Sequence, residues 1–311
     1  MTETTPQQTQ TTTSADTPLR ETALAAEHEA LGASFTDFGG WRMPLKYTSE
    51  LTEHRAVRET AGLFDLSHMG EIRVAGPDAA TYLNTALVGD LAKVKVGKAK
   101  YSLICAPDGG ILDDLIGYRI TEDEYLIVPN AGNRETVYAA MAERATGFDV
   151  EVWDESEAIS LIAVQGPKAE AIVSSLVRLD ETTIVENLPY YAADTVTIGG
   201  EEILLARTGY TGEDGFEMFL RDDKAGACGG RCSAVARSTA SPPAGWPAAT
   251  PCAWRPGCRS TAMNSPPSGS ASRPDCLWCP SPRRRTSWAA PRCSRPRPRA
   301  VGRPRVSGSS G

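Results

Sequence analysis

The chain changes character at Lys224, and this change limits what the protein can fold into. Residues 1–224 contain 38 of the 39 acidic residues and 18 of the 32 basic residues, whereas residues 225–311 contain Asp275, fourteen arginines and no lysine. The net charges are −20 and +13, which together give the −7 of the whole chain. Residues 225–311 also lack Ile, Phe and Tyr. They can bury too little apolar surface to offset the entropy of ordering, so we expect a disordered tail.

A balanced composition is confined to residues 20–224. Residues 1–19 are polar and lack the cationic and apolar regions of a signal peptide, so we expect a flexible arm. No segment reaches the ~18 apolar residues that a membrane-spanning helix needs. Cys105 is the one cysteine before residue 225, which fits a reduced, cytoplasmic protein without disulfides. The acidity of this part argues against a nucleic acid as its partner.

One arrangement occurs twice in the balanced part, namely an apolar strand, a Gly-Pro turn and a helix. "GEIRVAGPDAATYLNTAL" has Pro77 near the first turn of its helix, and "AISLIAVQGPKAEAIVSSLV" has Pro167 in the corresponding place. Proline is tolerated there because the first turn of a helix leaves its N–H groups unpaired. The repetition predicts two similar α+β modules.

Turn chemistry predicts further strands. "YSLICAPDGGILDDLIGYRI" predicts a hairpin folded at residues 107–110, and "DTVTIGGEEILLARTG" predicts another, folded at Gly199 and Gly200. Between them, "EYLIVPNAGNRETVYAAMAERA" predicts a strand and then a helix capped by Asn130 or Asn133.

Two carboxylates lie next to each other in the apolar strand "ILDDLIGY". Side chains alternate between the faces of a strand, so Asp113 and Asp114 point in opposite directions. A half-buried carboxylate can act as a general base or orient a cation, because desolvation or a nearby positive charge tunes its protonation. A paired or solvent-facing aspartate without a catalytic role fits the same pattern.

The segment "RTGYTGEDGFE" combines three glycines with Arg207, Tyr210 and three acidic residues, which is typical of a ligand-shaping loop before a strand. No Gly-Lys-Ser/Thr follows, so the segment does not indicate a phosphate-binding P-loop. A tight hairpin without a ligand is the alternative. His28, His54 and His68 share no metal-ligand spacing, although His68 could line a cleft from the loop "DLSHMG".

Five motifs give the chain a resemblance to a known family: "FGGWRMPLKY", "GLFDLSHMGEI", "GGILDDLIGYRI", "AVQGPK" and "RTGYTGEDGFE". In these motifs and their order, residues 20–224 resemble the T protein of the glycine cleavage system, a tetrahydrofolate-dependent aminomethyltransferase. The resemblance implies a multi-subdomain, folate-binding α+β fold with antiparallel sheets. In the family, a C-terminal β-barrel domain follows.

The resemblance also implies a reaction. An aminomethyl group on the lipoyl arm of the H protein is transferred to tetrahydrofolate, which gives 5,10-methylenetetrahydrofolate, ammonia and the reduced lipoyl arm. The implied partners are the lipoylated H protein and tetrahydrofolate as co-substrate. Neither a metal, a membrane nor a specific nucleic acid is implied.

Individual residues take roles from the family where its motifs stand. Asp114 matches the catalytic carboxylate, which can stabilise a cationic carbon and assist proton transfer between folate and the departing amine. Glu217 matches the acid that accepts two parallel N–H donors of the pterin. The other matches to positions lining the family's folate cavity, where aromatic rings would stack on the ligand, are Tyr101, Tyr118, Asn130, Arg207 and Tyr210.

The resemblance ends after Lys224, and the tail itself offers an explanation. Written in GC-rich codons and read from the third base of each codon, "WPAATPCAWRPGCRSTAMN" (residues 246–264) gives "ACRDTLRLEAGMPLYGNE", which is typical of the family's next segment. The same offset turns "RTSWAAPRC" (residues 285–293) into "DFVGRAAL", typical of its last domain. We therefore expect one change of reading frame near residues 225–227, whether a mutation or a sequencing error. We also expect an impaired enzyme, because the β-barrel domain is missing.

Other functions fit parts of the sequence. The cysteines at 228, 232, 276 and 279 resemble paired zinc ligands, and the arginine-rich end resembles a nucleic-acid-binding arm. Out-of-frame translation of GC-rich DNA yields the same composition without selection. The folate domain of a dimethylglycine or sarcosine oxidase is a nearer alternative, although no G-x-G-x-x-G flavin unit occurs here. A folate-binding maturation protein without transferase activity is another.

Overall fold

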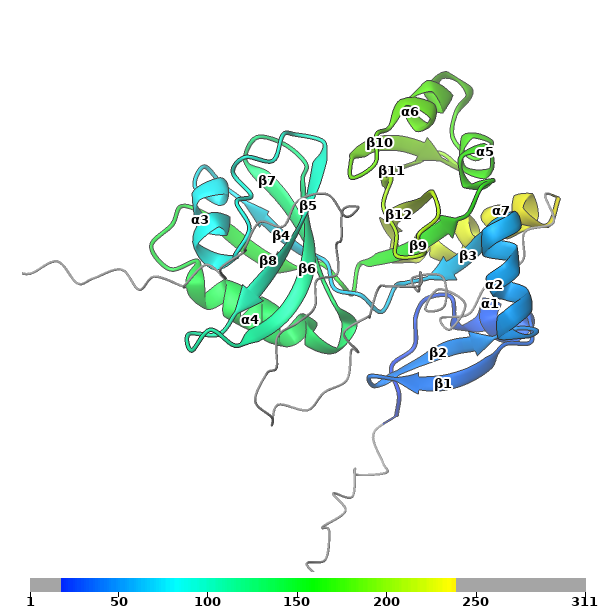
Figure 1. The fold of residues 1–311 in the computed structure, drawn as a ribbon, viewed down its shortest axis with the longest axis horizontal. Coiled ribbons are helices and arrows are strands. Elements are labelled where there is room, and N and C mark those ends of the chain that lie inside the picture. Colours follow the sequence, from blue (N-terminus) through cyan, green and yellow to red (C-terminus); the bar gives the residue numbers. More distant parts are fainter. Residues whose placement is uncertain (1–17, 239–311) are drawn as a thin grey trace, which may run out of the picture. The chain divides into compact units, whose positions relative to one another are not determined.

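The computed structural model of the protein describes residues 18–238, which form helices and three antiparallel β-sheets (Figure 1). The predicted combination of helices with antiparallel sheets is confirmed. Two of the sheets have five strands and the third has two. The predicted arm lies outside the described residues except for its last two, and so do residues 239–311 of the predicted tail.

The first module is a five-stranded sheet with two helices. Its strands are β4 (Ile72–Ala75), β5 (Lys98–Cys105), β6 (Ile111–Arg119), β7 (Glu124–Pro129) and β8 (Glu151–Asp154). The strand order is β5-β6-β7-β4-β8, and every pairing is antiparallel. Its helical elements are α3 (Ala79–Ala86), the 3-10 turn η1 (Ala131–Asn133) and α4 (Arg134–Arg144). Tyr82 of α3 and Met141 of α4 are buried in one core with the sheet.

The second module is also built on a five-stranded sheet, with η2 (Leu179–Glu181) and α6 (Thr182–Asn187) as additional helical elements. Its strands are β3 (Gly62–Asp65), β9 (Ile159–Gln165), β10 (Ala193–Ile198), β11 (Glu201–Ala206) and β12 (Gly215–Arg221), in the order β10-β11-β12-β9-β3. Its helical elements are α5 (Ala169–Ser174), η2, α6, η3 (Asp222–Lys224) and α7 (Ala225–Ser238). Residues of α5, α6 and α7 share one apolar core with the sheet, and Figure 1 shows α7 beside β9 and β3.

The two modules repeat one plan, as the two Gly-Pro turns predict. Each runs from a strand through a Gly-Pro turn into a helix, then through a hairpin and a strand into a 3-10 turn and a longer helix. The strand orders correspond place by place, with β8 in the position that β3 takes in the other sheet. The predicted hairpins are β5–β6 and β10–β11, and both are confirmed.

Glycine is required at both turns. Gly76 has φ +143° and Gly166 has φ +134°, a region that residues with a side chain rarely adopt. A Cβ atom would also lie 2.4 Å from the carbonyl oxygen of Asp149 at Gly76, and 2.6 Å from that of Val57 at Gly166. The backbone therefore passes too close for any other residue at either place.

A smaller unit precedes the modules. It contains α1 (Ala25–Ala30), the hairpin of β1 (Ser34–Phe38) and β2 (Trp41–Lys46), and α2 (Glu50–Glu59). The buried carboxylate of Asp65 joins this unit to β3, since it lies 2.8 Å from Nε2 of His28 and accepts a 2.6 Å hydrogen bond from Thr22. Burial alone would raise the pKa of Asp65, but the hydrogen bond with His28 and its charge hold that pKa below its usual value.

The predicted cap of α4 is confirmed in position only, since Asn133 is the N-cap residue of α4. Neither Asn130 nor Asn133 caps a helix with its side chain. Both side-chain amides donate to the carboxylate of Asp113 instead. These charge-assisted hydrogen bonds fix the orientation of both side chains, and neither side-chain oxygen accepts an N–H of the helix.

The predicted start of the tail at residue 225 is wrong. The chain continues through α7, in which Ala225, Cys228 and Cys232 are buried in the core of the second module. Composition did not reveal this helix, because its buried positions hold small side chains in place of branched aliphatic ones. The rest of the predicted tail lies outside the described residues.

Candidate active site

Asp113 and Asp114 differ in exposure as their alternation along β6 predicts. Asp113 is buried, whereas Asp114 is only partly buried. Tyr101 on β5 donates its hydroxyl to Oδ2 of Asp114. The amide Nδ2 of Asn130 lies 3.1 Å from Oδ1 of Asp114 and 2.9 Å from its carbonyl oxygen. The structure thus brings three of the predicted site residues, Asp114, Tyr101 and Asn130, into one cluster.

Asp113 supports this cluster from the opposite face. It accepts the backbone N–H of Asn130 at 2.9 Å and the side-chain amides of Asn130 at 3.0 Å and Asn133 at 2.7 Å. Loss of hydration raises the pKa of Asp113, and the hydrogen bonds from the two asparagines oppose that rise. Asp113 therefore fixes the turn that places Asn130 against Asp114. The sequence marked Asp113 only as one of an adjacent pair.

Glu217 on β12 forms a second polar cluster. Thr208 donates its hydroxyl to Oε2 of Glu217, and the Tyr118 hydroxyl lies 3.3 Å from the same oxygen and 3.0 Å from Oγ1 of Thr208. Loss of hydration raises the pKa of Glu217, while the hydrogen bonds from Thr208 and Tyr118 oppose that rise. The predicted pair of Glu217 and Tyr118 is brought together. Thr208 was missed, although it lies inside the motif "RTGYTGEDGFE".

Tyr118 connects the two modules. It belongs to β6 of the first sheet, yet its hydroxyl reaches Glu217 of the second, and its ring packs edge-on against Phe219 at 5.6 Å. Leu126 and Leu161, one from each sheet, are buried in the same apolar cluster. The two carboxylate clusters therefore stand on sheets that pack together through Tyr118.

Tyr191 adjoins both clusters and was not predicted. Its backbone N–H donates to the carbonyl of Arg207 at 3.0 Å, and its carbonyl accepts the N–H of Ala99 on β5 at 2.9 Å. Loss of hydration, and then the charges of Tyr190 and Glu217, raise the pKa of Tyr191 to about 12. The two adjacent tyrosines in "LPYYAAD" are the one signal in the sequence that could have indicated this site.

Tyr191 also has a rare backbone conformation. Its φ is +58°, and among the described residues other than glycine it alone has a positive φ. A bulky residue in this region costs about 1–3 kcal/mol and persists only where surrounding contacts hold it. The hydrogen bonds to both modules are contacts of that kind.

The remaining two predicted residues differ from each other. Tyr210 is 61% exposed and lies near Tyr101, whose pKa is raised first by burial, then by Asp114 and also by Tyr210. The guanidinium of Arg207, in contrast, binds Asp214 at 2.9 Å and Glu170 at 2.8 Å. Arg207 therefore forms ion pairs with these two acids and not with the other predicted site residues.

His68 does not line a cleft. Its side chain is fully buried and packs edge-on against Phe38, with 5.4 Å between the ring centres. Burial lowers its pKa to about 4, against the raising effect of Asp65. His68 is therefore a core histidine. Within residues 18–238, no three or more His, Cys, Asp or Glu side chains gather as metal ligands would.

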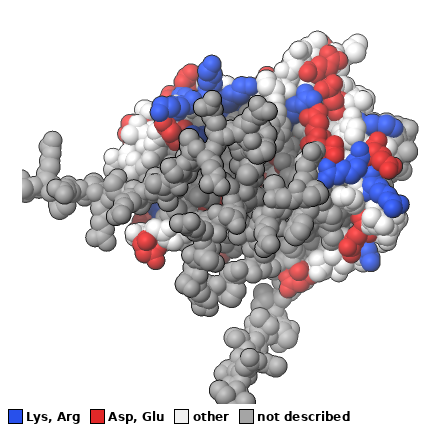
Figure 2. Space-filling model, viewed as in Figure 1, with Lys and Arg blue, Asp and Glu red and all other residues white. Residues whose placement is uncertain are grey.

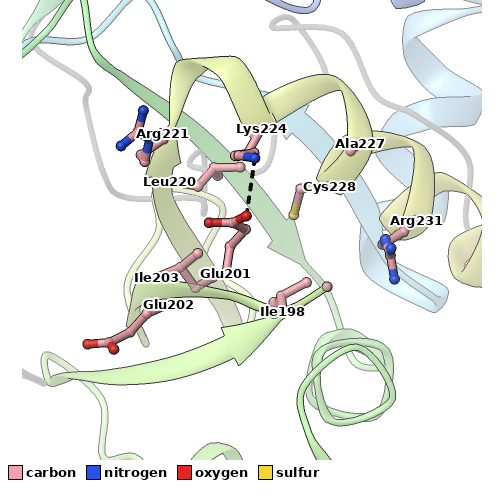
Figure 3. Close-up of a pocket in the computed structure, with 11 residues that line it drawn as sticks. Ile198, Glu201, Glu202, Ile203, Leu220, Arg221, Lys224, Ala227, Cys228 and Arg231 are labelled. Atoms are coloured by element: carbon pink, nitrogen blue, oxygen red, sulfur yellow. Dashed lines mark ion pairs between the residues drawn. The ribbon is translucent and has the colours of Figure 1, made fainter.

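A pocket lies elsewhere in the second module, between the β10–β11 hairpin and α7 (Figure 3). Ile198, Ile203 and Leu220 face Cys228 across it, and an ion pair of 3.2 Å joins Glu201 to Lys224. None of the predicted site residues line this pocket.

On the face drawn in Figure 2, acidic and basic side chains lie interspersed over the described residues. Among the helices that the structure describes, none combines the length and the apolar character required to cross a membrane.

Comparison with known proteins agrees with the motifs. Residues 24–251 match the family described as GCVT N-terminal domain, a match that extends beyond residue 224, where the resemblance in motifs ends. The chain is 57% identical over 221 residues to an aminomethyltransferase of Corynebacterium jeikeium, which covers 67% of this chain and 57% of that protein. It is 57% identical over 209 residues to an aminomethyltransferase of Streptomyces coelicolor, covering 67% of this chain and 55% of that protein.

A solved structure shows the same fold. The glycine cleavage system aminomethyltransferase T of Bartonella henselae is 36% identical, with a TM-score of 0.68, and the match covers 76% of this chain and 62% of that one. The chain spans a little over half the length of the two curated relatives. With a family match over most of its residues and a shared fold, the chain belongs to the GCVT N-terminal domain family.

Proposed function

We propose that the protein is the tetrahydrofolate-dependent aminomethyltransferase of a glycine cleavage system. Its substrates are tetrahydrofolate and an H protein whose lipoyl arm carries an aminomethyl group. The observation that carries the proposal is the pair of tyrosine-bound carboxylates, Asp114 and Glu217, on two sheets packed together through Tyr118. Relatives that bear the name aminomethyltransferase support it.

The reaction needs a group that handles both charge and protons. The C–S and C–N bonds of the aminomethyl group break, and the carbon bonds to two folate nitrogens. The protons of these two nitrogens go to the lipoyl sulfur and to the departing ammonia. We assign Asp114 to this step, because a carboxylate beside the carbon stabilises its cationic character and can relay a proton. Tyr101 and Asn130 hold this carboxylate in one orientation.

We assign Glu217 to the recognition of the pterin. A carboxylate accepts two parallel N–H donors when each of its oxygens has a free lone pair. Thr208 and Tyr118 both lie against Oε2, and we assign Oε1 to the pterin. Since Tyr118 can donate to Thr208 instead, one acceptor position remains on Oε2 as well. Tyr191 and Tyr210 supply aromatic rings nearby.

The test is aminomethyl transfer from loaded H protein to tetrahydrofolate, followed by the formation of methylenetetrahydrofolate. Asp114→Asn should lower the rate by about 100-fold or more while folate still binds. Glu217→Gln should instead weaken folate binding, by about 30-fold or more if the loss exceeds ~2 kcal/mol. A protein that binds no folate, or an Asp114→Asn variant of unchanged rate, would contradict the proposal.

We further propose that the reading frame changes near residues 225–227. The two family-like segments recovered from residues 246–264 and 285–293 with one common offset support this. The transfer assay therefore includes a version of the protein with the frame corrected. The absence of activity in both versions would count against the enzyme, whereas its appearance only in the corrected version would support the frame change. Genomic resequencing of codons 220–230 tests the same point directly.

The cellular setting follows as part of the same proposal. The lipoylated H protein is the partner, and the compartment is the cytoplasm. Cys105, Cys228 and Cys232 are free thiols, which is compatible with a reducing compartment.

A further inference from the structure

All the hydrogen-bond donors of the Arg207 side chain bind acceptors within the protein. Nε donates to Oδ1 of Asp214 at 2.9 Å, and Nη2 donates to Oδ2 of Asp214 at 2.5 Å and to Oε2 of Glu170 at 2.8 Å. Nη1 donates to the carbonyl of Leu188 at 3.2 Å and, more weakly, to that of Val185 at 3.5 Å. A guanidinium has five N–H donors, and here each has an acceptor.

These acceptors come from three segments that are separate in the sequence. Glu170 lies on α5, Val185 and Leu188 lie at the end of α6 and just beyond it, and Asp214 immediately precedes β12. The side chain is 16% exposed, and its guanidinium carbon lies 4.9 Å from the ring centre of Phe216. Arg207 thus joins α5, the segment after α6 and the loop before β12.

The backbone of Arg207 binds one of these segments a second time. Its N–H donates to the carbonyl of Ala192 at 2.8 Å, and its carbonyl accepts the N–H of Tyr191 at 3.0 Å. The side chain fixes the start of the segment 188–192, and the main chain fixes its end. Tyr191, in its rare conformation, lies between these two attachments.

We propose that Arg207 is a positioning residue, which holds Tyr191 on one side and the Thr208–Asp214 loop on the other in the arrangement that surrounds Glu217, without touching the substrate. This assignment rests on the proposed function and replaces the sequence-based expectation that Arg207 lines the folate cavity. Lysine cannot take over this role, because a single ammonium group cannot reach two carboxylates and a carbonyl in the planar arrangement of a guanidinium.

The first experiment needs no ligand. Hydrogen exchange is measured on the full chain with Arg207→Lys, and with Arg178→Lys as a matched control. Arg178 also binds an aspartate through two nitrogens, Asp180 at 3.1 and 2.6 Å, but its side chain is exposed and its other ion pair is with the neighbouring Glu181. We expect the amides of residues 188–192 to exchange about tenfold faster or more in Arg207→Lys, with β6 unchanged. Unchanged exchange at 188–192 would overturn the proposal.

A second variant guards against misfolding of the first. Asp214→Asn keeps Arg207 but removes the charge that two of its nitrogens share. It should accelerate exchange in residues 188–192 less than Arg207→Lys does, and again without an effect on β6. Acceleration spread evenly over both modules in each variant would show a general loss of stability, which would contradict a positioning role.

The second experiment separates positioning from direct contact. Binding of 5-formyltetrahydrofolate with one or with five glutamates, and of tetrahydropterin, which has none, is compared between the wild type and Arg207→Lys. If Arg207 is a positioning residue, Arg207→Lys weakens the binding of all three ligands by the same factor. A factor that grows with the number of ligand carboxylates would show direct contact and overturn the proposal. If the wild type binds none of the three ligands, the proposed function fails. The hydrogen-exchange experiment still tests whether Arg207 holds residues 188–192 in place.

Discussion

Helices α4 and α7 occupy the same place in the two modules, but different side chains fill it. Each follows a 3-10 turn, and in each the first, fourth and eighth residues are buried. These residues are Arg134, Val137 and Met141 in α4, and Ala225, Cys228 and Cys232 in α7. One plan of packing is thus met by large side chains in the first module and by small ones in the second.

The remainder of α7 also suits a helix poorly. Gly226, Gly229 and Gly230 lie inside it, and each costs about 1 kcal/mol relative to alanine in a helix interior. The pocket of Figure 3 lies beside Ala227 and Cys228, where a larger side chain would stand. The fold therefore places a helix where the sequence gives little support for one.

The proposed change of reading frame would account for this contrast at the two cysteines. Cysteine codons begin with TG, so a codon made of the preceding base and these two always encodes leucine, valine or methionine. Whatever codons were used, positions 228 and 232 would then carry large apolar residues. Those are the residue types that Val137 and Met141 supply in α4. The comparison thus supports the frame change independently of residues 239–311.

The modules differ in their proposed functional residues as well. Asp114 stands on β6, which corresponds to β11, whereas Glu217 stands on β12, which corresponds to β7. The repeat therefore supplies two similar frameworks, but the proposed site uses a different strand from each.

Truncation of the eighth residue of each helix should show the largest difference in stability between α4 and α7. Met141→Ala should cost about 2–5 kcal/mol, because it leaves a cavity in a packed core. Cys232→Ala should cost less than about 1.5 kcal/mol, since it removes a single sulfur atom. Urea unfolding of both variants measures the difference. Equal costs would show that α7 packs as well as α4.

Substitution of the turn glycines should have the next largest effect, and the same in both modules. Gly76→Ala and Gly166→Ala should each cost at least about 1–3 kcal/mol, because the new Cβ meets the backbone in a strained conformation. Gly109→Ala is the control, since Gly109 has φ +90° but nothing within 4 Å of its Cβ. A control as costly as the two variants in thermal unfolding would exclude the close approach as the cause.

Larger side chains in α7 should have the opposite effect and stabilise the protein. Cys228→Leu combined with Cys232→Leu should stabilise the protein by about 0.5–2 kcal/mol, because the proposed reading frame places large apolar residues at both positions and Cys228 borders the pocket beside α7. Val137→Leu, at the matching place in α4, should give no gain since that core is full. Calorimetry compares the two. A double variant less stable than the wild type would contradict the proposed frame change.

The smallest expected effect is a pH dependence that originates at Glu217. Its pKa is raised above the ordinary 4.5, so the folded state holds the proton more tightly than the unfolded chain. This contribution is present in full below pH 4.5 and is lost as the pH rises through the raised pKa. Glu217→Gln should therefore lose less stability than the wild type over that interval in urea titrations. Parallel curves would contradict the assignment.

The sequence predicts the repeated elements well and the contacts between them poorly. Gly-Pro turns, hairpin glycines and alternation along β6 are local signals, and the structure follows each of them. The predicted side-chain cap by an asparagine is absent, because hydrogen bonds to Asp113, distant in the sequence, fix both asparagine side chains. Tyr191 was missed because its site is created by Ala99 and Arg207, which only the folded chain brings close.

The rare conformation of Tyr191 has a consequence for the contact between the two modules. Its backbone N–H is hydrogen-bonded to the second module and its carbonyl to the first, so this residue bridges the two modules. If the two sheets moved apart, one of these hydrogen bonds would break or the backbone at Tyr191 would change. The contact between the modules is therefore coupled to the conformation of this one residue.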